Sequence, residues 1–269
     1  MKLSYAISLQ ETIFSHISKG GWIDKVNILA DLGYEGVEFG IRNPDKIDSR
    51  QIEQVLGRNS LRLSAIGTGQ MFVDDGLSIS SLSKDIRHRA ISRIRKHIVL
   101  ARLFESQVII GLARGKKSAI RKNNDSRYMK YLKDGFREIC DCAEKNKVAV
   151  TIEPINRYET SFLNCAEEVK SFERILNSPS LKIMLDTFHA NIEEKNFLQA
   201  VKISGRFLSH VHLSDNNRLC PGRGHLDFKL IIGLLRKSGY VGYLSAEILP
   251  FPDFKACAKE YITNIRRYL

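Results

Sequence analysis

The chain has 269 residues, of which 43% are hydrophobic and 27% are charged, and its formal net charge at pH 7 is +12. These proportions are those of a folded globular protein and exclude general disorder and low complexity. No apolar run approaches the roughly 18 residues that a membrane-spanning helix needs.

Short apolar runs rich in β-branched residues alternate along the chain with longer runs of helical period. Amphipathic helices are clearest at 132–143, 169–176 and 258–265. The predicted strands are Leu3–Ile7, Gly36–Phe39, Arg62–Ile66, Gln107–Leu112, Val148–Glu153, Lys182–Asp186, Leu208–Leu213 and Tyr243–Ile248.

Eight strand-plus-helix units of roughly 34 residues each match the size of a (β/α)8 barrel. An open doubly wound sheet is the alternative, but it usually carries a glycine-rich turn after its first strand. The sequence Ile7-Ser-Leu-Gln-Glu-Thr12 has no such turn, and no linker divides the chain. We therefore predict an α/β fold with a single barrel domain over residues 1–269.

Two basic segments carry much of the positive charge. In the segment 84–96, Ile86, Ala90 and Ile94 recur at helical spacing, which predicts a helix with its basic side facing outward. The run from Lys116 to Lys122 is predicted to be a loop. Neither segment interleaves aromatic residues as a single-strand nucleic-acid platform would. We interpret the charge as a solvated surface and predict no nucleic-acid or membrane partner.

Four residue types that bind metals occur at the ends of the last four predicted strands. Glu153, Asp186, His212 and Glu247 are spaced 33, 26 and 35 residues apart, about one strand-plus-helix unit each. The carboxyl ends of barrel strands form one face, and adjacent strands lie about 4.8 Å apart. Four such side chains could therefore converge on one ion.

A single glutamate or histidine near a strand end is more often a cap or a core residue than a ligand. Four such residues at the ends of consecutive apolar strands instead indicate a functional site, because an unpaired buried carboxylate is costly. Three carboxylates with one imidazole suit one divalent ion, Mn²⁺, Co²⁺ or Mg²⁺, better than a structural zinc.

More polar residues follow these strand ends. Asn156, Arg157 and Glu159 follow the fifth strand, His189 follows the sixth, and Arg218 follows the seventh. Histidine and arginine beside a metal are suited to binding hydroxyls and stabilising an enediolate. Arg157 could equally be an ion-pair partner, and the sequence 221–224 could be a simple turn.

These motifs resemble the sugar isomerase/epimerase family with a xylose-isomerase-like TIM barrel, especially its ketose 3-epimerase branch. Within that branch, the resemblance is strongest to 5-keto-L-gluconate epimerases, and it extends over essentially the whole chain. The segments that carry it are Glu153-Pro-Ile-Asn-Arg-Tyr-Glu159, Asp186-Thr-Phe-His189, 212–218, Pro221-Gly-Arg-Gly-His225, Glu247, 65–70, 75–79 and 108–115.

The resemblance implies a divalent metal ion held by Glu153, Asp186, His212 and Glu247. It also implies that Glu153 and Glu247 are the catalytic acid/base pair of an epimerase, and that Glu159, His189 and Arg218 bind substrate oxygens. Members of this family often form dimers or tetramers.

A keto-acid sugar, such as 5-keto-L-gluconate or tagaturonate, would need a cation for its carboxylate. We expect Arg114, just past the fourth strand, and Arg42, just past the second, as candidates. Both could instead be surface loop residues, and a sugar phosphate would suit them equally well.

Other functions use the same barrel. A one-metal aldose–ketose or hydroxypyruvate-type isomerase needs the same ligands, whereas a two-metal isomerase needs an Asp-x-Asp pair where Ser214-Asp-Asn-Asn217 stands. A DNA-repair endonuclease with three zinc ions needs additional histidines at the ends of early strands. The segments that follow the third and fourth predicted strands, 67–70 and 111–114, contain no histidine. A non-catalytic sugar-binding role would leave the acid/base pair unused.

The cellular compartment is inferred from two features. The amino-terminal residues turn polar too early for a secretory signal. The five cysteines are odd in number and contain no Cys-x-x-Cys pair, so a disulfide framework and a zinc knuckle are not expected. We expect a cytoplasmic protein with reduced cysteines.

Overall fold

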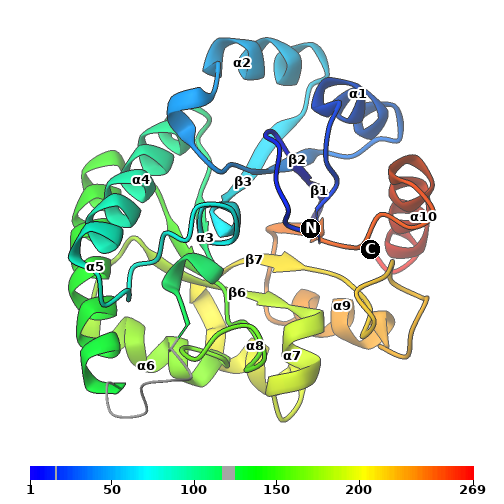
Figure 1. Cartoon of the computed structure of the whole chain (residues 1–269). Coiled ribbons are helices and arrows are strands. Elements are labelled where there is room, and N and C mark those ends of the chain that lie inside the picture. The colour runs from blue at the N-terminus through cyan, green and yellow to red at the C-terminus, as the bar shows by residue number, and fades with distance from the viewer. Residues whose placement is uncertain (16, 117–124) are drawn as a thin grey trace.

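A computed structural model describes residues 1–15, 17–116 and 125–269 of the chain. Eight parallel strands close into a barrel, each paired with its neighbours in sequence, and β8 pairs with β1. Helices surround the barrel (Figure 1). The strands are β1 (Lys2–Ser8), β2 (Gly36–Gly40), β3 (Arg62–Gly67), β4 (Val108–Ile110), β5 (Val150–Ile152), β6 (Leu181–Asp186), β7 (Leu208–His212) and β8 (Tyr243–Ala246).

The predicted (β/α)8 barrel is confirmed, and each of the eight predicted strands contains one of the observed strands or nearly coincides with it. The described helices are α1 (Trp22–Asp31), α2 (Ser49–Arg58), α3 (Gly69–Val73), α4 (Lys84–Leu103), α5 (Asp125–Asn146), α6 (Ala166–Leu176), α7 (Thr187–Glu193), α8 (Phe197–Ser204), α9 (Phe228–Lys237) and α10 (Phe254–Arg266). Short 3₁₀ turns occupy η1 (Pro44–Lys46), η2 (Leu112–Arg114) and η3 (Gly205–Phe207).

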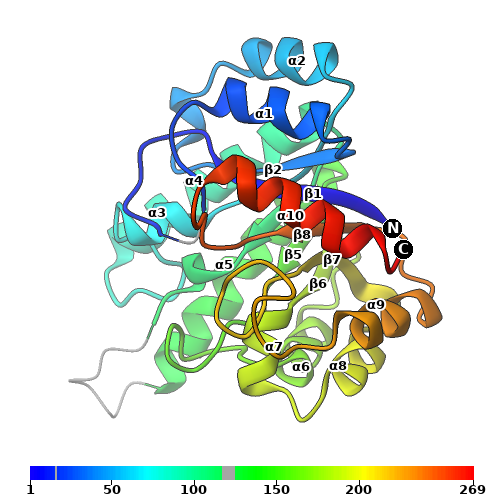
Figure 2. The ribbon, with the colours of Figure 1, turned by 90° about the vertical axis from the view of Figure 1, so that its right-hand side faces the viewer.

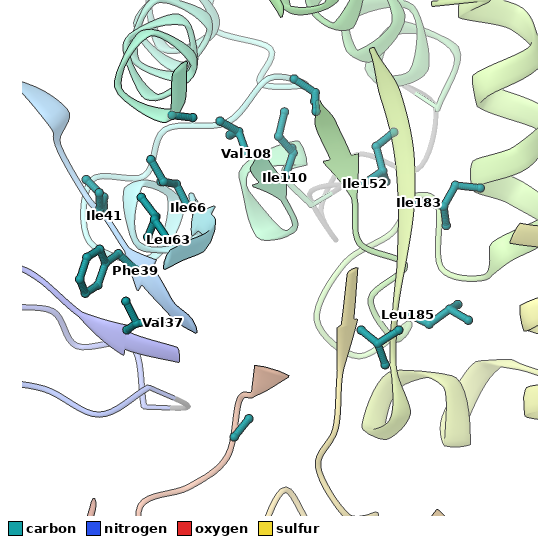
Figure 3. Close-up of a cluster of buried hydrophobic side chains, with 14 of the residues drawn as sticks. Val37, Phe39, Ile41, Leu63, Ile66, Val108, Ile110, Ile152, Ile183 and Leu185 are labelled. Carbon is teal, nitrogen blue, oxygen red and sulfur yellow. The ribbon is translucent and has the colours of Figure 1, made fainter. Parts of the chain in front are cut away.

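The main hydrophobic core lies between the barrel and the helices that surround it. Alternate strand residues point to opposite faces of a sheet, so every second residue of a strand enters this core. Val37 and Phe39 of β2, Ile152 of β5 and Ile183 and Leu185 of β6 belong to it, with others of the cluster in Figure 3. The intervening residues therefore face the barrel interior.

The basic segment 84–96 forms the first part of α4, as predicted. Ala90 and Ile94 are fully buried, whereas Arg89, Arg95 and Lys96 are exposed. The second basic run lies largely outside the described residues, since only Lys116 of it is described. None of the described helices is both long and apolar enough to cross a bilayer. All five cysteines are free thiols.

The two ends of the chain lie close together in both views (Figures 1 and 2). The chain enters β1 at the amino-terminal end of the barrel, and α10 returns to that same end after β8. The carboxyl ends of all eight strands therefore meet at the opposite face, which is where the loops that follow the strands gather.

Candidate active site

The four predicted ligand residues lie at the carboxyl-terminal face of the barrel. Asp186 and His212 are the last residues of β6 and β7 and lie opposite each other in register. Glu153 and Glu247 each follow their strands, β5 and β8, by one residue. Their neighbours Ile152, Leu185, Val211 and Ala246 belong to the outer core, so strand alternation turns all four polar side chains inward.

The four side chains converge. One ligand atom from each of Glu153, Asp186, His212 and Glu247 lies within 4.8 Å of the others. The imidazole nitrogen Nδ1 of His212 is 3.6 Å from Glu153 Oε1, 3.7 Å from Asp186 Oδ2 and 3.4 Å from Glu247 Oε2. The geometry brings one nitrogen and three carboxylate oxygens around one point.

This donor set fits a divalent cation. Among the described residues, Glu153 Oε1 and His212 Nδ1 are buried with no hydrogen-bond partner, although both are good metal ligands. Two of the three carboxylates, those of Asp186 and Glu247, pair with the Arg218 guanidinium. Burial opposes protonation of His212, but Glu38 and Glu247 outweigh it and raise the pKa of His212 well above its usual value. Positive charge is therefore favoured at this point, and a bound divalent ion would supply it.

Local structure orients the carboxylate of Asp186. Its Oδ1 atom accepts the backbone N–H of Phe188 at 2.8 Å and so caps α7. Its Oδ2 atom is thereby directed toward Arg218 and His212. At β4, Gly111 makes room for Glu153, because a Cβ at Gly111 would lie 2.5 Å from Glu153 Oε2.

The environment separates the pKa values of the two glutamates. Burial, with Glu247 and Asp186 nearby, raises the pKa of Glu153 to about 7. Burial also opposes ionisation of Glu247, but the adjacent Arg218 and His212 outweigh it and lower its pKa. The same Arg218 guanidinium lowers the pKa of Asp186 against the effect of burial. One glutamate therefore holds a proton readily near neutral pH and the other does not.

His189 faces the same point from α7. Its Nε2 atom is 3.9 Å from both Glu153 Oε1 and Asp186 Oδ2. Asn156 donates from Nδ2 to His189 Nδ1 at 2.8 Å and to Glu159 Oε1 at 2.8 Å. Because Nδ1 accepts, the ring proton of neutral His189 lies on Nε2 and is directed toward the four-residue cluster.

Arg218 also reaches the cluster. Its Nη1 donates to Asp186 Oδ2 at 2.6 Å and its Nη2 donates to Glu247 Oε2. The guanidinium lies over the Phe188 ring, 4.8 Å from its centroid. Arg218 itself has a left-handed backbone, with φ of 64°, a conformation that costs a non-glycine residue about 1–3 kcal/mol. The surrounding loop holds this conformation and aims the side chain inward.

The predicted role of Arg114 in binding a substrate carboxylate does not match its position. η2 follows β4 after Gly111 and turns the Arg114 side chain into the protein, where it is fully buried. The guanidinium donates to the backbone oxygens of Ile110, at 3.0 Å, of Glu153, and of Phe162, at 3.3 Å. Arg114 therefore stabilises the backbone that carries Glu153 and is not among the residues that line the cavity.

Arg42, the other residue predicted to bind a substrate carboxylate, is paired with an acidic side chain. Its Nε donates to Asp75 Oδ1 at 2.9 Å, and Arg93 shares the same carboxylate. Arg42 is not among the residues that line the cavity. Arg157 pairs with Glu193 through contacts of 2.8 and 2.9 Å, which favours the ion-pair interpretation of that residue.

The sequence 221–224 supports the loop that carries Arg218. The buried Asp215 carboxylate accepts the backbone N–H groups of Gly222, at 2.9 Å, and Gly224, at 2.8 Å. A Cβ at Gly224 would lie 2.3 Å from Asp215 Oδ1, so only glycine allows this approach. The turn is structural, and Arg223 pairs with Glu260 outside the cavity.

Sequence reasoning missed Glu38, His210 and Gln70. Glu38 is a buried carboxylate that hydrogen-bonds to His210 and His212, and Glu38 and Gln70 both line the cavity. A signal existed for Glu38, because it is the single charged residue in the apolar strand 36–39. Gln70, the second residue of α3, lies in the segment 65–70 that carries the family resemblance, but no role was predicted for it.

The family profile described as "Xylose isomerase-like TIM barrel" matches residues 26–262. This chain belongs to that family. Among curated relatives of this barrel chain, the D-psicose 3-epimerase of Enterocloster bolteae is 44% identical over 116 residues, covering 43% of this chain and 38% of the relative. The ketose 3-epimerase of Arthrobacter globiformis is 25% identical over 244 residues, covering 84% and 77%.

A solved structure shares the fold along its full length. The apo 3-keto-D-glucoside 4-epimerase of Escherichia coli superposes with a TM-score of 0.83 and 19% identity, covering 99% of this chain and 100% of that chain. The stretch of this chain that matches the E. bolteae relative spans under two fifths of that relative's length. The two relatives and the solved structure described here are named as epimerases of keto sugars.

Proposed function

We propose that this protein is a divalent-metal-dependent sugar epimerase that inverts the carbon next to the ketone of a ketose or keto sugar. The observation that carries the proposal is the convergence of Glu153 and Glu247, with opposite pKa shifts, on one point shared with Asp186 and His212. The names of the relatives favour the same chemistry.

Inversion requires two proton transfers on opposite faces of the substrate. One carboxylate removes the proton from the carbon beside the ketone, the electron pair moves into the carbonyl to give an enediolate, and the other carboxyl group returns a proton from the other side. Glu247, with its lowered pKa, is suited to accept a proton, and Glu153, with a pKa of about 7, is suited to donate one. The roles exchange in the reverse direction.

The enediolate carries negative charge on the substrate oxygens. His189 offers its Nε2 proton, and Arg218 offers a guanidinium that already contacts Asp186 and Glu247. A divalent ion held by Glu153, Asp186, His212 and Glu247 would withdraw electrons from the ketone and neighbouring hydroxyl oxygens and so acidify the carbon.

The lining of the cavity favours an uncharged sugar over a keto-acid sugar. Away from the carboxylates, its walls include Phe14, Ile17, Leu112 and Ile155, together with the neutral Gln70. Among the described residues that line it, the cationic side chain is Arg218, which is paired with Asp186 and Glu247. A substrate carboxylate would compete with those two carboxylates for the same guanidinium.

We expect Gln70 to bind a substrate hydroxyl. Ser8 donates its hydroxyl proton to Gln10 O at 2.6 Å, so its oxygen accepts from Gln70 Nε2 at 2.7 Å. This fixes the amide and leaves Gln70 Oε1, buried and without a partner among the described residues, as an acceptor. Gln70→Leu should raise KM for a neutral ketose about 10-fold with little change in kcat, which steady-state kinetics would measure. An unchanged KM would exclude the contact.

The reaction itself is tested with a panel of ketoses, keto-acid sugars and their phosphates in the presence of Mn²⁺. Chromatography resolves epimers, and the proposal expects interconversion of at least one neutral ketose pair, such as D-psicose and D-fructose. Conversion of keto acids alone would contradict the argument from the cavity lining. No conversion across the panel would contradict the proposed function.

A one-metal aldose–ketose isomerase is the second candidate, because it needs the same ligand residues. Proton NMR in D₂O separates the two: deuterium at C3 indicates 3-epimerisation, whereas deuterium at C1 or C2 indicates isomerisation. The three-zinc endonuclease is disfavoured. Among the described residues, the two groups able to hold an ion are Glu38-His210-His212 and the four-residue cluster, and they share His212.

A further inference from the structure

A chain of hydrogen bonds crosses the barrel interior and ends at the candidate metal site. It runs from Gln107, which immediately precedes β4, through His210 of β7 and Glu38 of β2 to His212 of β7. Glu38, His210 and His212 are all at least 97% buried. Sequence position alone does not connect these residues, because Glu38 lies more than 170 positions from both histidines.

The contacts at Gln107 set the direction of the chain. Its Oε1 atom accepts from the hydroxyls of Thr151, at 2.7 Å, and Ser209, at 2.9 Å. Its Nε2 atom therefore faces the Ser64 carbonyl oxygen, at 3.3 Å, and His210 Nδ1, at 3.4 Å. Since an amide nitrogen only donates, His210 Nδ1 is an acceptor and the ring proton of His210 lies on Nε2.

Glu38 receives protons from both histidines. His210 Nε2 is 2.9 Å from Glu38 Oε2, and His212 Nε2 is 3.0 Å from the same oxygen and 3.2 Å from Oε1. A carboxylate only accepts hydrogen bonds, so His212 also carries a proton on Nε2. With the Nε2 proton held by Glu38, Nδ1 is the ring nitrogen that can bind a metal ion, and Nδ1 is the atom that faces Glu153, Asp186 and Glu247.

We propose that Glu38 is a positioning residue that selects the Nε2-protonated form of His212 and so prepares Nδ1 to bind the divalent ion. His210 holds the shared carboxylate oxygen from the other side and prevents the Glu38 carboxylate from turning away. The inference rests on the proposed function, because it assumes that the four-residue cluster binds a metal. A carboxylate that orients a metal-binding histidine in this way commonly contributes to affinity.

The experiment compares wild type with Glu38→Gln. The amide replaces one accepting oxygen by a donor, so it cannot accept from both imidazoles in the observed arrangement. We expect the Mn²⁺ dissociation constant, measured by titration with detection of free Mn²⁺ by electron paramagnetic resonance, to rise about 10–100-fold. Glu260→Gln, at the ion pair with Arg223 outside the barrel, is the matched control and should bind Mn²⁺ as wild type does.

A second measurement, the position of the ring proton of His212, can be made on wild type and so does not depend on whether the variant folds. In wild type labelled with ¹⁵N-histidine and loaded with diamagnetic Mg²⁺, long-range ¹H–¹⁵N spectra should show the His212 proton on Nε2. In folded Glu38→Gln we expect a mixture of the two ring forms, which a merely structural role for Glu38 would not produce.

The possible results separate the inference from the proposed function. A Glu38→Gln affinity within 2-fold of wild type would overturn the positioning role alone. A proton on His212 Nδ1 in loaded wild type would overturn the positioning role and also remove His212 from the proposed ligand set. Two ions per chain would also overturn it, because Glu38, His210 and His212 would then form a metal site of their own. A wild type that binds no divalent ion would overturn the proposed function, and the inference with it.

Discussion

Replacing Glu153 or Glu247 by glutamine is expected to abolish epimerisation while the fold survives. An amide cannot carry the proton that each face of the substrate must exchange, and general acid–base groups typically contribute 10²–10⁴-fold to rate. We therefore expect kcat to fall at least about 100-fold in either variant. The outer core beneath these residues, including Ile152 and Ala246, is untouched, so circular dichroism and the melting temperature should change little.

The two variants should differ in the half-reaction that they retain. In D₂O, the remaining carboxylate can still exchange the proton on its own face, so each variant should incorporate deuterium into one epimer without inverting it. The two variants should label different epimers. Glu260→Gln provides a control for the carboxylate-to-amide change. Unchanged turnover in either purified variant would remove the two-carboxylate mechanism.

The second large effect is expected at the metal site. Asp186→Asn and His212→Ala each remove one donor from the cluster, and the loss of affinity should exceed the roughly 10–100-fold typical of groups outside a ligand set. For Asp186→Asn, the Arg218 guanidinium also loses its charged partner at 2.6 Å, so the geometry around the remaining ligands should loosen. Treatment of wild type with a chelator should abolish activity, and Mn²⁺ should restore it.

Metal analysis after exhaustive dialysis measures directly how much metal wild type and each variant retain. Thermal melting with and without Mn²⁺ provides a second measurement. An ion at 100 times its dissociation constant stabilises a folded protein by about 2.7 kcal/mol, so wild type should show a clear rise in melting temperature that both variants lack. His225→Ala, which changes an exposed histidine beyond the site, is the matched control. Full retention of metal by both variants would exclude the proposed ligand set.

Arg114 shows why a residue near a strand end need not face the cavity. From the sequence, β4 was expected to continue to Leu112 and to leave Arg114 at the mouth of the barrel. The strand ends at Ile110, and η2 turns the guanidinium inward to backbone oxygens, including that of Glu153. The turn depends on which carbonyl groups the fifth strand and its loop leave unpaired nearby, which is a property of the folded chain.

The sequence alone determined the fold class and the positions of the four cluster residues. Strand alternation and the regular spacing of strand-plus-helix units are local patterns, since each is set by which side chains within a few residues must be buried. The inward direction of Glu153, Asp186, His212 and Glu247 follows from those patterns once the barrel closes.

Only the tertiary structure decided how charges and protons are distributed around the site. The hydrogen bonds of Glu38 to His210 and His212 join residues from strands that lie far apart in the sequence. The engagement of Arg42 by Asp75 likewise joins separate loops. Such pairings depend on distances of a few ångströms between side chains of different elements, because hydrogen bonding and charge screening in a buried site change steeply over that range.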